Sequence, residues 1–219
     1  MKPRLEILPA HQRRLWPELS QIDQHFVLYG GTAIALRLAK RQSIDFDFFT
    51  EKPLSADDLT RNLPFLRGAH VLQAEPNTAT FSIERDGEIK VSFFGGLSFG
   101  RVGVPERCED NGLWVASLLD LAAQKMKVIL SRAEAKDYLD IHALIEAGIT
   151  LPLALAAAQA LYPEFNPLIS LKALAYYGEA SLAAVPAAVR EKLESESATV
   201  ASVQPIEKAA GTISFSQSQ

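Results

Sequence analysis

Hydrophobic and polar residues alternate most regularly between positions 43 and 49. In an extended chain the apolar residues would share one face and the polar residues the other: Ile44, Phe46 and Phe48 against Ser43, Asp45 and Asp47. The pattern predicts a central β-strand with one face in the core.

The segment before this strand predicts a helix, a short strand and a second helix. Residues 4–24 carry apolar positions near the helical period, and the run 26–29 is apolar and meets Gly30-Gly31. A strand entering a turn that glycine tolerates best fits this arrangement. Thr32 is then expected to be the N-cap of a helix that continues to Leu38.

A β-hairpin is predicted after a short helix over 55–61 that Ser55 would cap. Residues 78–84 and 88–94 alternate, and Arg85-Asp86-Gly87 between them is typical of a hairpin turn. The glycine-rich run 95–103 is expected to be a loop.

Helical patterns dominate from there on. They cover residues 113–148 with a break near 131–133, then 151–161 and 167–177, and the last residues are rich in Ser, Ala, Thr and Gln. We therefore expect an α+β fold: a mixed β-sheet with flanking helices over 1–105, a helical subdomain over 106–195 and a loosely ordered tail over 196–219.

Composition narrows the class of protein. The formal net charge is −4 and the single cysteine cannot form an internal disulfide. The N-terminal residues lack the apolar core of a signal peptide, and residues 151–161 are too few to span a bilayer. These observations predict a cytoplasmic protein without a membrane partner, and they argue against a permanent nucleic-acid coat while allowing a transient RNA substrate.

The Gly30-Gly31-Thr32 junction is a candidate phosphate site. A strand that ends in glycines and opens a helix presents backbone N–H groups and the positive end of the helix dipole. Such junctions also occur as purely structural turns, so this junction alone decides nothing.

Asp45 and Asp47 are candidate metal ligands. Alternate residues of a strand project from the same face, so both carboxylates could reach one Mg²⁺ or Mn²⁺ ion together with the phosphates of a nucleoside triphosphate. Alternatively, the two aspartates lie at an exposed edge or cap a neighbouring helix. The upstream glycine pair favours the metal.

Two separated blocks of sequence resemble the AbiEii/AbiGii toxin family of nucleotidyltransferases, within the polymerase-beta-like superfamily. The first block reads YGGTAIAL over 29–36 and RQSIDFDFF over 41–49. The second reads LAAQK over 121–125, then Arg132, then KDYLD over 136–140. The order and spacing of both blocks fit the family pattern, and the resemblance extends over about residues 25–148.

The resemblance implies a nucleotidyltransferase-like mixed β-sheet with flanking helices, followed by a C-terminal helical subdomain, and a role for each matching residue. Gly30, Gly31 and Thr32 would hold the triphosphate, with Ser43 and Arg41 contacting phosphate, although Arg41 could also pair with a surface carboxylate. Asp45 and Asp47 would bind the metal. Lys125 and Asp137 would complete the catalytic site from the helical part. Without the resemblance, the spacing of Lys136 and Asp140 predicts a surface ion pair. Lys125 and Arg132 would then be solvated side chains on one helix face.

One departure concerns a third carboxylate, which this superfamily usually carries on the strand after the acidic pair. Here that position falls on or near Ser92, and Glu88 is the nearest acidic residue on the same face. Either the two aspartates suffice with help from Asp137, or activity is reduced.

The sequence thus supports two main hypotheses. The first is a Mg²⁺-dependent nucleotidyltransferase that transfers a nucleoside monophosphate from an NTP to RNA, such as a tRNA end, or to a protein, and that acts as a toxin with a cognate antitoxin. The second is a catalytically reduced module that binds nucleotide or protein. Hydrolysis of a phosphoester by the same carboxylates is a third reading.

Overall fold

The computed structural model describes residues 1–215, which form two compact units. Of the described residues, the N-terminal unit comprises 1–100, 104–117 and 210–215, whereas the helical unit comprises 101–103 and 118–209. The sequence placed the division at residue 105, but the segment up to 117 still belongs to the N-terminal unit because it adds two strands to the sheet.

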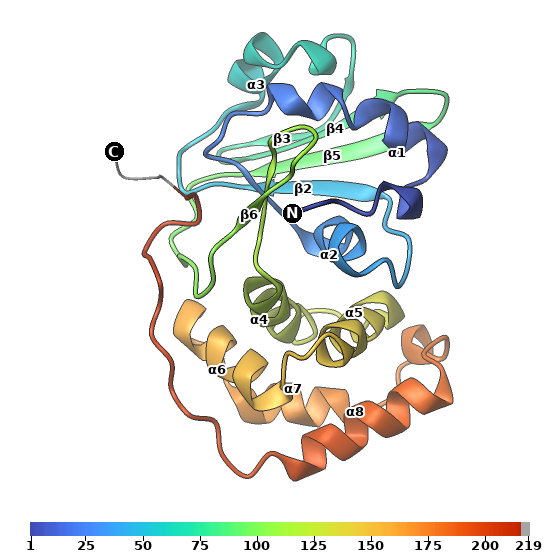
Figure 1. Cartoon of the computed structure of the whole chain (residues 1–219), viewed down its shortest axis with the longest axis vertical. Coiled ribbons are helices and arrows are strands. Elements are labelled where there is room, and N and C mark those ends of the chain that lie inside the picture. The colour runs from blue at the N-terminus through green and yellow to red at the C-terminus, as the bar shows by residue number, and fades with distance from the viewer. Residues whose placement is uncertain (216–219) are drawn as a thin grey trace. The chain divides into compact units, whose positions relative to one another are not determined.

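The N-terminal unit is built on a seven-stranded mixed sheet of order β3-β4-β5-β2-β1-β7-β6 (Figure 1). The strands are β1 Val27–Tyr29, β2 Asp45–Phe49, β3 His70–Glu75, β4 Thr78–Glu84, β5 Glu88–Phe94, β6 Glu106–Arg107 and β7 Trp114–Val115. β2 lies antiparallel to β1 and parallel to β5, so it is central, as predicted.

The apolar face of the sheet forms the core of this unit. Phe46 and Phe48 on β2 are fully buried beside Val91 and Phe93 on β5, and the Phe48 and Phe93 rings stack 5.4 Å apart. We call the opposite side, which carries Asp45, Asp47, Lys90 and Ser92, the polar face.

Helices cover both faces of this sheet. The helical elements are η1 Leu5–Ile7, α1 Ala10–Leu15, η2 Glu18–Gln21, α2 Gly30–Leu38, α3 Ala56–Asn62 and η3 Pro64–Leu66. In Figure 1, α1 and α3 lie on one side of the sheet and α2 on the other. Trp16, which follows α1, meets the Phe46 ring of the apolar face at 6.3 Å.

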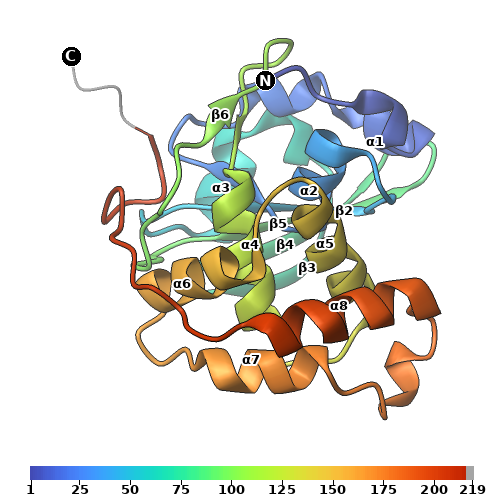
Figure 2. The same cartoon turned by 60° about the horizontal axis from the view of Figure 1, so that its bottom comes forward.

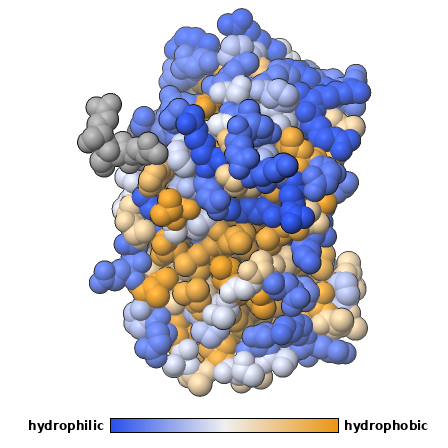
Figure 3. All heavy atoms as spheres, in the orientation of Figure 1, coloured by the Kyte–Doolittle hydropathy of each residue, from blue (hydrophilic) through white to orange (hydrophobic). Residues whose placement is uncertain are grey.

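The helical unit consists of α4 Leu118–Val128, α5 Ala135–Glu146, α6 Leu151–Leu161, α7 Pro167–Leu174, η4 Ala180–Leu182 and α8 Ala187–Thr199 (Figure 2). α6 is apolar on almost every side and packs mainly against α4. Figure 3 shows apolar residues gathered over these two helices. The carboxylate of Asp120 in α4 accepts hydrogen bonds from the backbone of Val102 and Gly103, which joins the 101–103 segment to this unit.

Several sequence expectations are confirmed. The strands β1, β2, β4 and β5, the hairpin turn and the helices α2 and α4 to α7 all lie where the patterns predicted them. Ser55 caps α3 by accepting a hydrogen bond from the Asp58 N–H at 3.2 Å.

Other expectations are wrong. The N-terminal helix is divided into η1, α1 and η2, with Pro9 and Pro17 between the pieces, because proline has no N–H for a continuous helix. The N-cap of α2 is Tyr29, not Thr32, which lies within the helix. Ile44 precedes β2 and is 62% exposed instead of sharing the buried face. Residues 114–115 form β7 rather than helix.

The tail also differs from its prediction. α8 runs to Thr199, and Ile213 is 1% exposed in the N-terminal unit, where Ser214 donates hydrogen bonds to Glu51. The last four positions of the expected tail, 216–219, lie outside the described residues.

Within residues 1–215, no single helix has the length and apolar character required to cross a bilayer, and only the bent pair of α5 and α6 meets that test jointly.

Candidate functional site

The Gly30-Gly31 turn joins β1 directly to α2. Gly30 has φ +74°, a left-handed conformation that a residue with a Cβ adopts only with strain, and it is the first residue of the helix. The side chain of the N-cap residue, Tyr29, forms no capping hydrogen bond. The turn therefore lies at the positive end of the α2 helix dipole, a position that suits a phosphate group.

Asp47 approaches this turn from the neighbouring strand. It lies beside Tyr29 in the antiparallel β1–β2 pair, and its Oδ2 atom would be only 2.6 Å from a Cβ placed on Gly30. Glycine at position 30 therefore allows both the left-handed turn and the close approach of the carboxylate.

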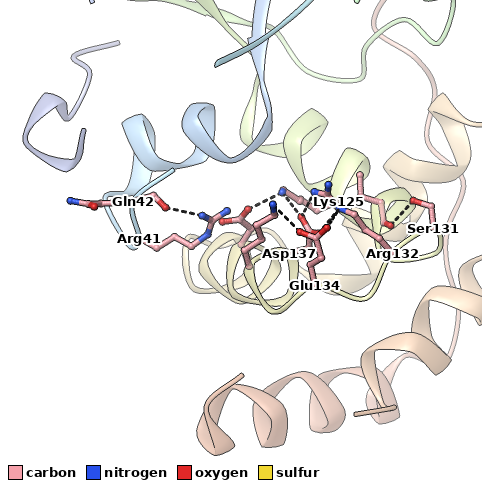
Figure 4. A network of polar contacts seen from close by, with 10 residues as sticks. Arg41, Gln42, Lys125, Ser131, Arg132, Glu134 and Asp137 are labelled. Carbon is pink, nitrogen blue, oxygen red and sulfur yellow. Dashed lines mark hydrogen bonds and ion pairs between the residues drawn. The ribbon is translucent and has the colours of Figure 1, made fainter. Parts of the chain in front are cut away.

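Arg41 and Ser43 approach the second glycine. A Cβ on Gly31 would lie 2.8 Å from the Arg41 Nη2 atom and 2.8 Å from the Ser43 Oγ atom. The Arg41 guanidinium also donates to the Gln42 carbonyl at 2.8 Å, an interaction drawn in Figure 4. A cation and a hydroxyl therefore converge at the amino end of α2, where the sequence had placed phosphate-binding residues.

Thr32 ties the helix to the acidic strand. Its hydroxyl donates a hydrogen bond to the backbone carbonyl of Asp45, and the side chain is fully buried. This bond fixes the start of β2 against the first turn of α2, so Thr32 holds the site together through its side chain rather than by capping the helix.

The pair Asp45 and Asp47 fits a divalent cation of the Mg²⁺ type. Both carboxylates are partly exposed on the polar face, at alternate positions of one strand. Among residues 1–215 no group of three or more His, Cys, Asp or Glu side chains is arranged to hold a metal. Two carboxylates nevertheless match Mg²⁺, which usually binds one or two protein carboxylates and completes its shell with substrate phosphates and water.

Ser92 occupies the position of the expected third carboxylate. It lies next to Asp47 in the parallel β2–β5 pair, is 2% exposed and accepts a hydrogen bond from the Thr80 hydroxyl at 3.3 Å. Glu88 instead accepts a hydrogen bond from Ser82 at 2.7 Å. The polar face therefore carries two carboxylates near the turn and a hydroxyl beside them.

The second sequence block forms a buried ionic cluster in the helical unit (Figure 4). The ammonium of Lys125 on α4 lies 2.7 Å from Asp137 and 2.8 Å from Asp140, both on α5, and all three side chains are at most 5% exposed. Arg132, in the turn between the helices, donates to Asp137 through Nε and Nη2. Arg132 also lies 3.6 Å from Glu134, so each of the two cations is held between two carboxylates.

The pKa of Asp137 reports the strength of this cluster. Burial alone would raise the pKa of this carboxyl, but the charge and hydrogen bonds of Lys125 and Arg132 outweigh burial and hold it below its ordinary value. Asp137 is therefore ionised at neutral pH and fixes the orientation of both cations.

The structure distinguishes between some of the alternatives that the sequence left open for residues 125–140. Lys136 pairs with Glu134 at 2.8 Å, so the surface pair of Lys136 with Asp140 is wrong, and Lys125 is buried rather than solvated. Asp140 and Arg132, whose roles the sequence did not assign, belong to the same cluster as Lys125 and Asp137. The i,i+3 spacing of Asp137 and Asp140, which places both on one face of α5, was the available signal.

Comparison with known proteins agrees with both blocks. Residues 14–205 match the family described as the nucleotidyl transferase AbiEii toxin of type IV toxin–antitoxin systems. The chain is also 33% identical over 162 residues to an uncharacterized protein of Aquifex aeolicus (strain VF5), a match that covers 73% of this chain and 77% of that protein.

Proposed function

We propose that this chain transfers a nucleoside monophosphate from an NTP to an RNA or protein hydroxyl. The premise is that the chain belongs to the AbiEii family of nucleotidyl transferase toxins of type IV toxin–antitoxin systems. The acceptor oxygen would attack the α-phosphorus as the bond to pyrophosphate breaks, and the proton of the hydroxyl would pass to solvent or to a nearby carboxylate. A cognate antitoxin is the partner that this family implies.

One observation carries the proposal. Asp47, Ser43 and Arg41 all approach the amino end of α2, and the two glycines leave room for them. Backbone N–H groups, a hydroxyl and a guanidinium together suit a triphosphate, and they stabilise negative charge that develops on the leaving pyrophosphate.

Asp45 and Asp47 are the residues that would hold Mg²⁺ or Mn²⁺. The bound cation would neutralise phosphate charge and polarise the α-phosphoryl group. The protein itself contributes a fixed arrangement of the two carboxylates, since the bond from Thr32 to the Asp45 carbonyl anchors the start of the strand.

Lys125 and Asp137 are proposed to act as a unit. In the helical unit the Lys125 ammonium is held between two carboxylates, which fixes its position but also satisfies its charge. A contribution of Lys125 to phosphate binding would require it to exchange a carboxylate for a phosphate, whereas Asp137 would keep Arg132 and Lys125 oriented.

Label transfer tests the proposal directly. Purified protein is incubated with Mg²⁺, each of the four α-³²P-labelled NTPs, total RNA and total protein, beside the double variant Asp45→Asn/Asp47→Asn. We expect label on RNA or protein with the wild type and at least a 100-fold loss with the variant, since both metal ligands are removed.

The control is Asp58→Asn, which neutralises an exposed aspartate of α3 on the same unit and should leave transfer unchanged.

Ser92 supports the second candidate, a nucleotide-binding module without turnover, because it leaves the site with two carboxylates. Absence of label with every NTP, from protein that binds NTP and is folded by circular dichroism, would favour that module.

A further inference from the structure

Lys90 is an unassigned cation next to the acidic pair. In the parallel β2–β5 pair it lies beside Asp45, just as Ser92 lies beside Asp47, so its side chain leaves the sheet on the polar face. Neighbouring strands are about 4.8 Å apart, which places the base of this side chain within one strand spacing of a metal ligand.

The exposure of Lys90 is unusual for its position. β5 lies inside the sheet, between β4 and β2, yet Lys90 is exposed and forms no ion pair with any residue that the structure describes, Asp45 included. α2 packs against β1 and β2. The polar face is therefore open to solvent at Lys90, on the side of β2 away from the helix.

This side of β2 is where an acceptor would approach. The groups suited to the triphosphate, from the turn, Arg41 and Ser43, all lie on the β1–α2 side of the carboxylates. In-line displacement requires the attacking hydroxyl to enter opposite the leaving pyrophosphate. The acceptor would then lie over β5 at Lys90, where the polar face is exposed, and not at Ser92, which is buried.

We propose that Lys90 binds the acceptor and that the acceptor is a polynucleotide, one phosphate of which contacts the Lys90 ammonium while a neighbouring hydroxyl reaches the acidic pair. This inference rests on the proposed function. An exposed lysine without a partner matches a phosphodiester, which carries an anion beside each sugar hydroxyl, whereas a serine, threonine or tyrosine acceptor carries none of its own.

The test measures binding of a fluorescein-labelled single-stranded RNA oligonucleotide at a series of salt concentrations, without NTP. Lys90→Ala is compared with Lys90→Arg, which keeps the charge, and with Lys52→Ala. Lys52 is an exposed lysine of the same unit that follows the far end of β2, so it controls for the loss of net charge. Circular dichroism and thermal unfolding establish that each variant is folded.

We expect Lys90→Ala to weaken RNA binding about fivefold and to lower the slope of log affinity against log salt by about one phosphate contact. Lys90→Arg should keep most of the RNA affinity and of the salt slope, and Lys52→Ala should change neither quantity. In the transfer assay, Lys90→Ala should raise the KM for RNA and leave the KM for NTP unchanged.

Equal affinity and equal salt slope in Lys90→Ala and wild type would overturn the proposal, as would wild-type protein that binds no RNA. Failure of the Lys90 proposal and failure of the proposed transferase activity give different results. A lowered salt slope without any label transfer retains Lys90 as an RNA ligand and removes the transferase, whereas transfer to protein with an unchanged slope retains the transferase and removes this role of Lys90.

Discussion

At the scale of single residues, the site depends on glycines whose missing side chains make room for charged groups. Gly30 combines φ +74° with an Asp47 oxygen at 2.6 Å from its would-be Cβ. We expect Gly30→Ala to cost about 1–2 kcal/mol of stability through the left-handed backbone alone. It should also abolish NTP binding in isothermal titration with Mg²⁺, because Asp47 and the turn must separate.

Gly68→Ala is the matched control for that prediction. Gly68 has φ +81° in the same unit, but nothing lies within 4 Å of its would-be Cβ. The variant should lose similar stability and bind NTP normally. If both variants bound NTP equally well, the convergence of Asp47 on the turn would have no role in nucleotide binding.

At the scale of elements, the sequence predicted the strands that have one buried and one polar face. β2, β4 and β5 alternate because their apolar sides form the core, and the same alternation placed Asp45, Asp47 and Ser92 correctly. β3 escaped prediction because all six of its residues are exposed at the sheet edge, so no pattern marks it. Contacts between distant segments, such as Arg41 with Gly31 or the carboxylates around Lys125, follow from tertiary packing and not from local periodicity.

The pairing of α4 with α5 through Lys125 leads to a prediction about acid stability. Asp137 has a lowered pKa in the folded protein, so its contribution is complete above the unfolded value near 4 and is lost as pH falls through the folded value. We expect Asp137→Asn to cost about 3 kcal/mol near neutral pH, since it leaves Lys125 and Arg132 partly uncompensated in a buried cluster. Urea titrations followed by far-UV circular dichroism should show this gap narrowing below about pH 4.

Glu196→Gln provides the comparison within the same unit. Glu196 pairs with Lys192 along α8 at 2.9 Å, and both side chains are partly exposed. Solvent screens such a pair, so its loss should change stability much less. A gap between Asp137→Asn and wild type that stayed constant down to pH 2.5 would contradict the lowered pKa.

At the scale of the whole molecule, the fold of the N-terminal unit is completed by the end of the chain. After the helical unit, residues 210–215 return to it, where Ile213 is buried and the Phe215 ring meets Trp114 at 5.3 Å. Both hydrogen bonds from Ser214 go to Glu51, directly after β2. A segment whose composition suggested weak order is thus held by contacts with residues far away in the sequence.

This arrangement predicts which unit responds to a change near the C-terminus. Both tryptophans, Trp16 and Trp114, belong to the N-terminal unit, so tryptophan fluorescence reports its unfolding. We expect Ile213→Ala to destabilise that unit by about 2–4 kcal/mol and to move the fluorescence transition to lower urea, since it leaves a cavity in a filled core. Leu193→Ala, at a fully buried position of α8, should cost as much but act on the transition of the helical unit. If both variants shifted the fluorescence transition equally, the two units would unfold as one cooperative system, and the C-terminal segment would stabilise the whole chain rather than the sheet that it completes.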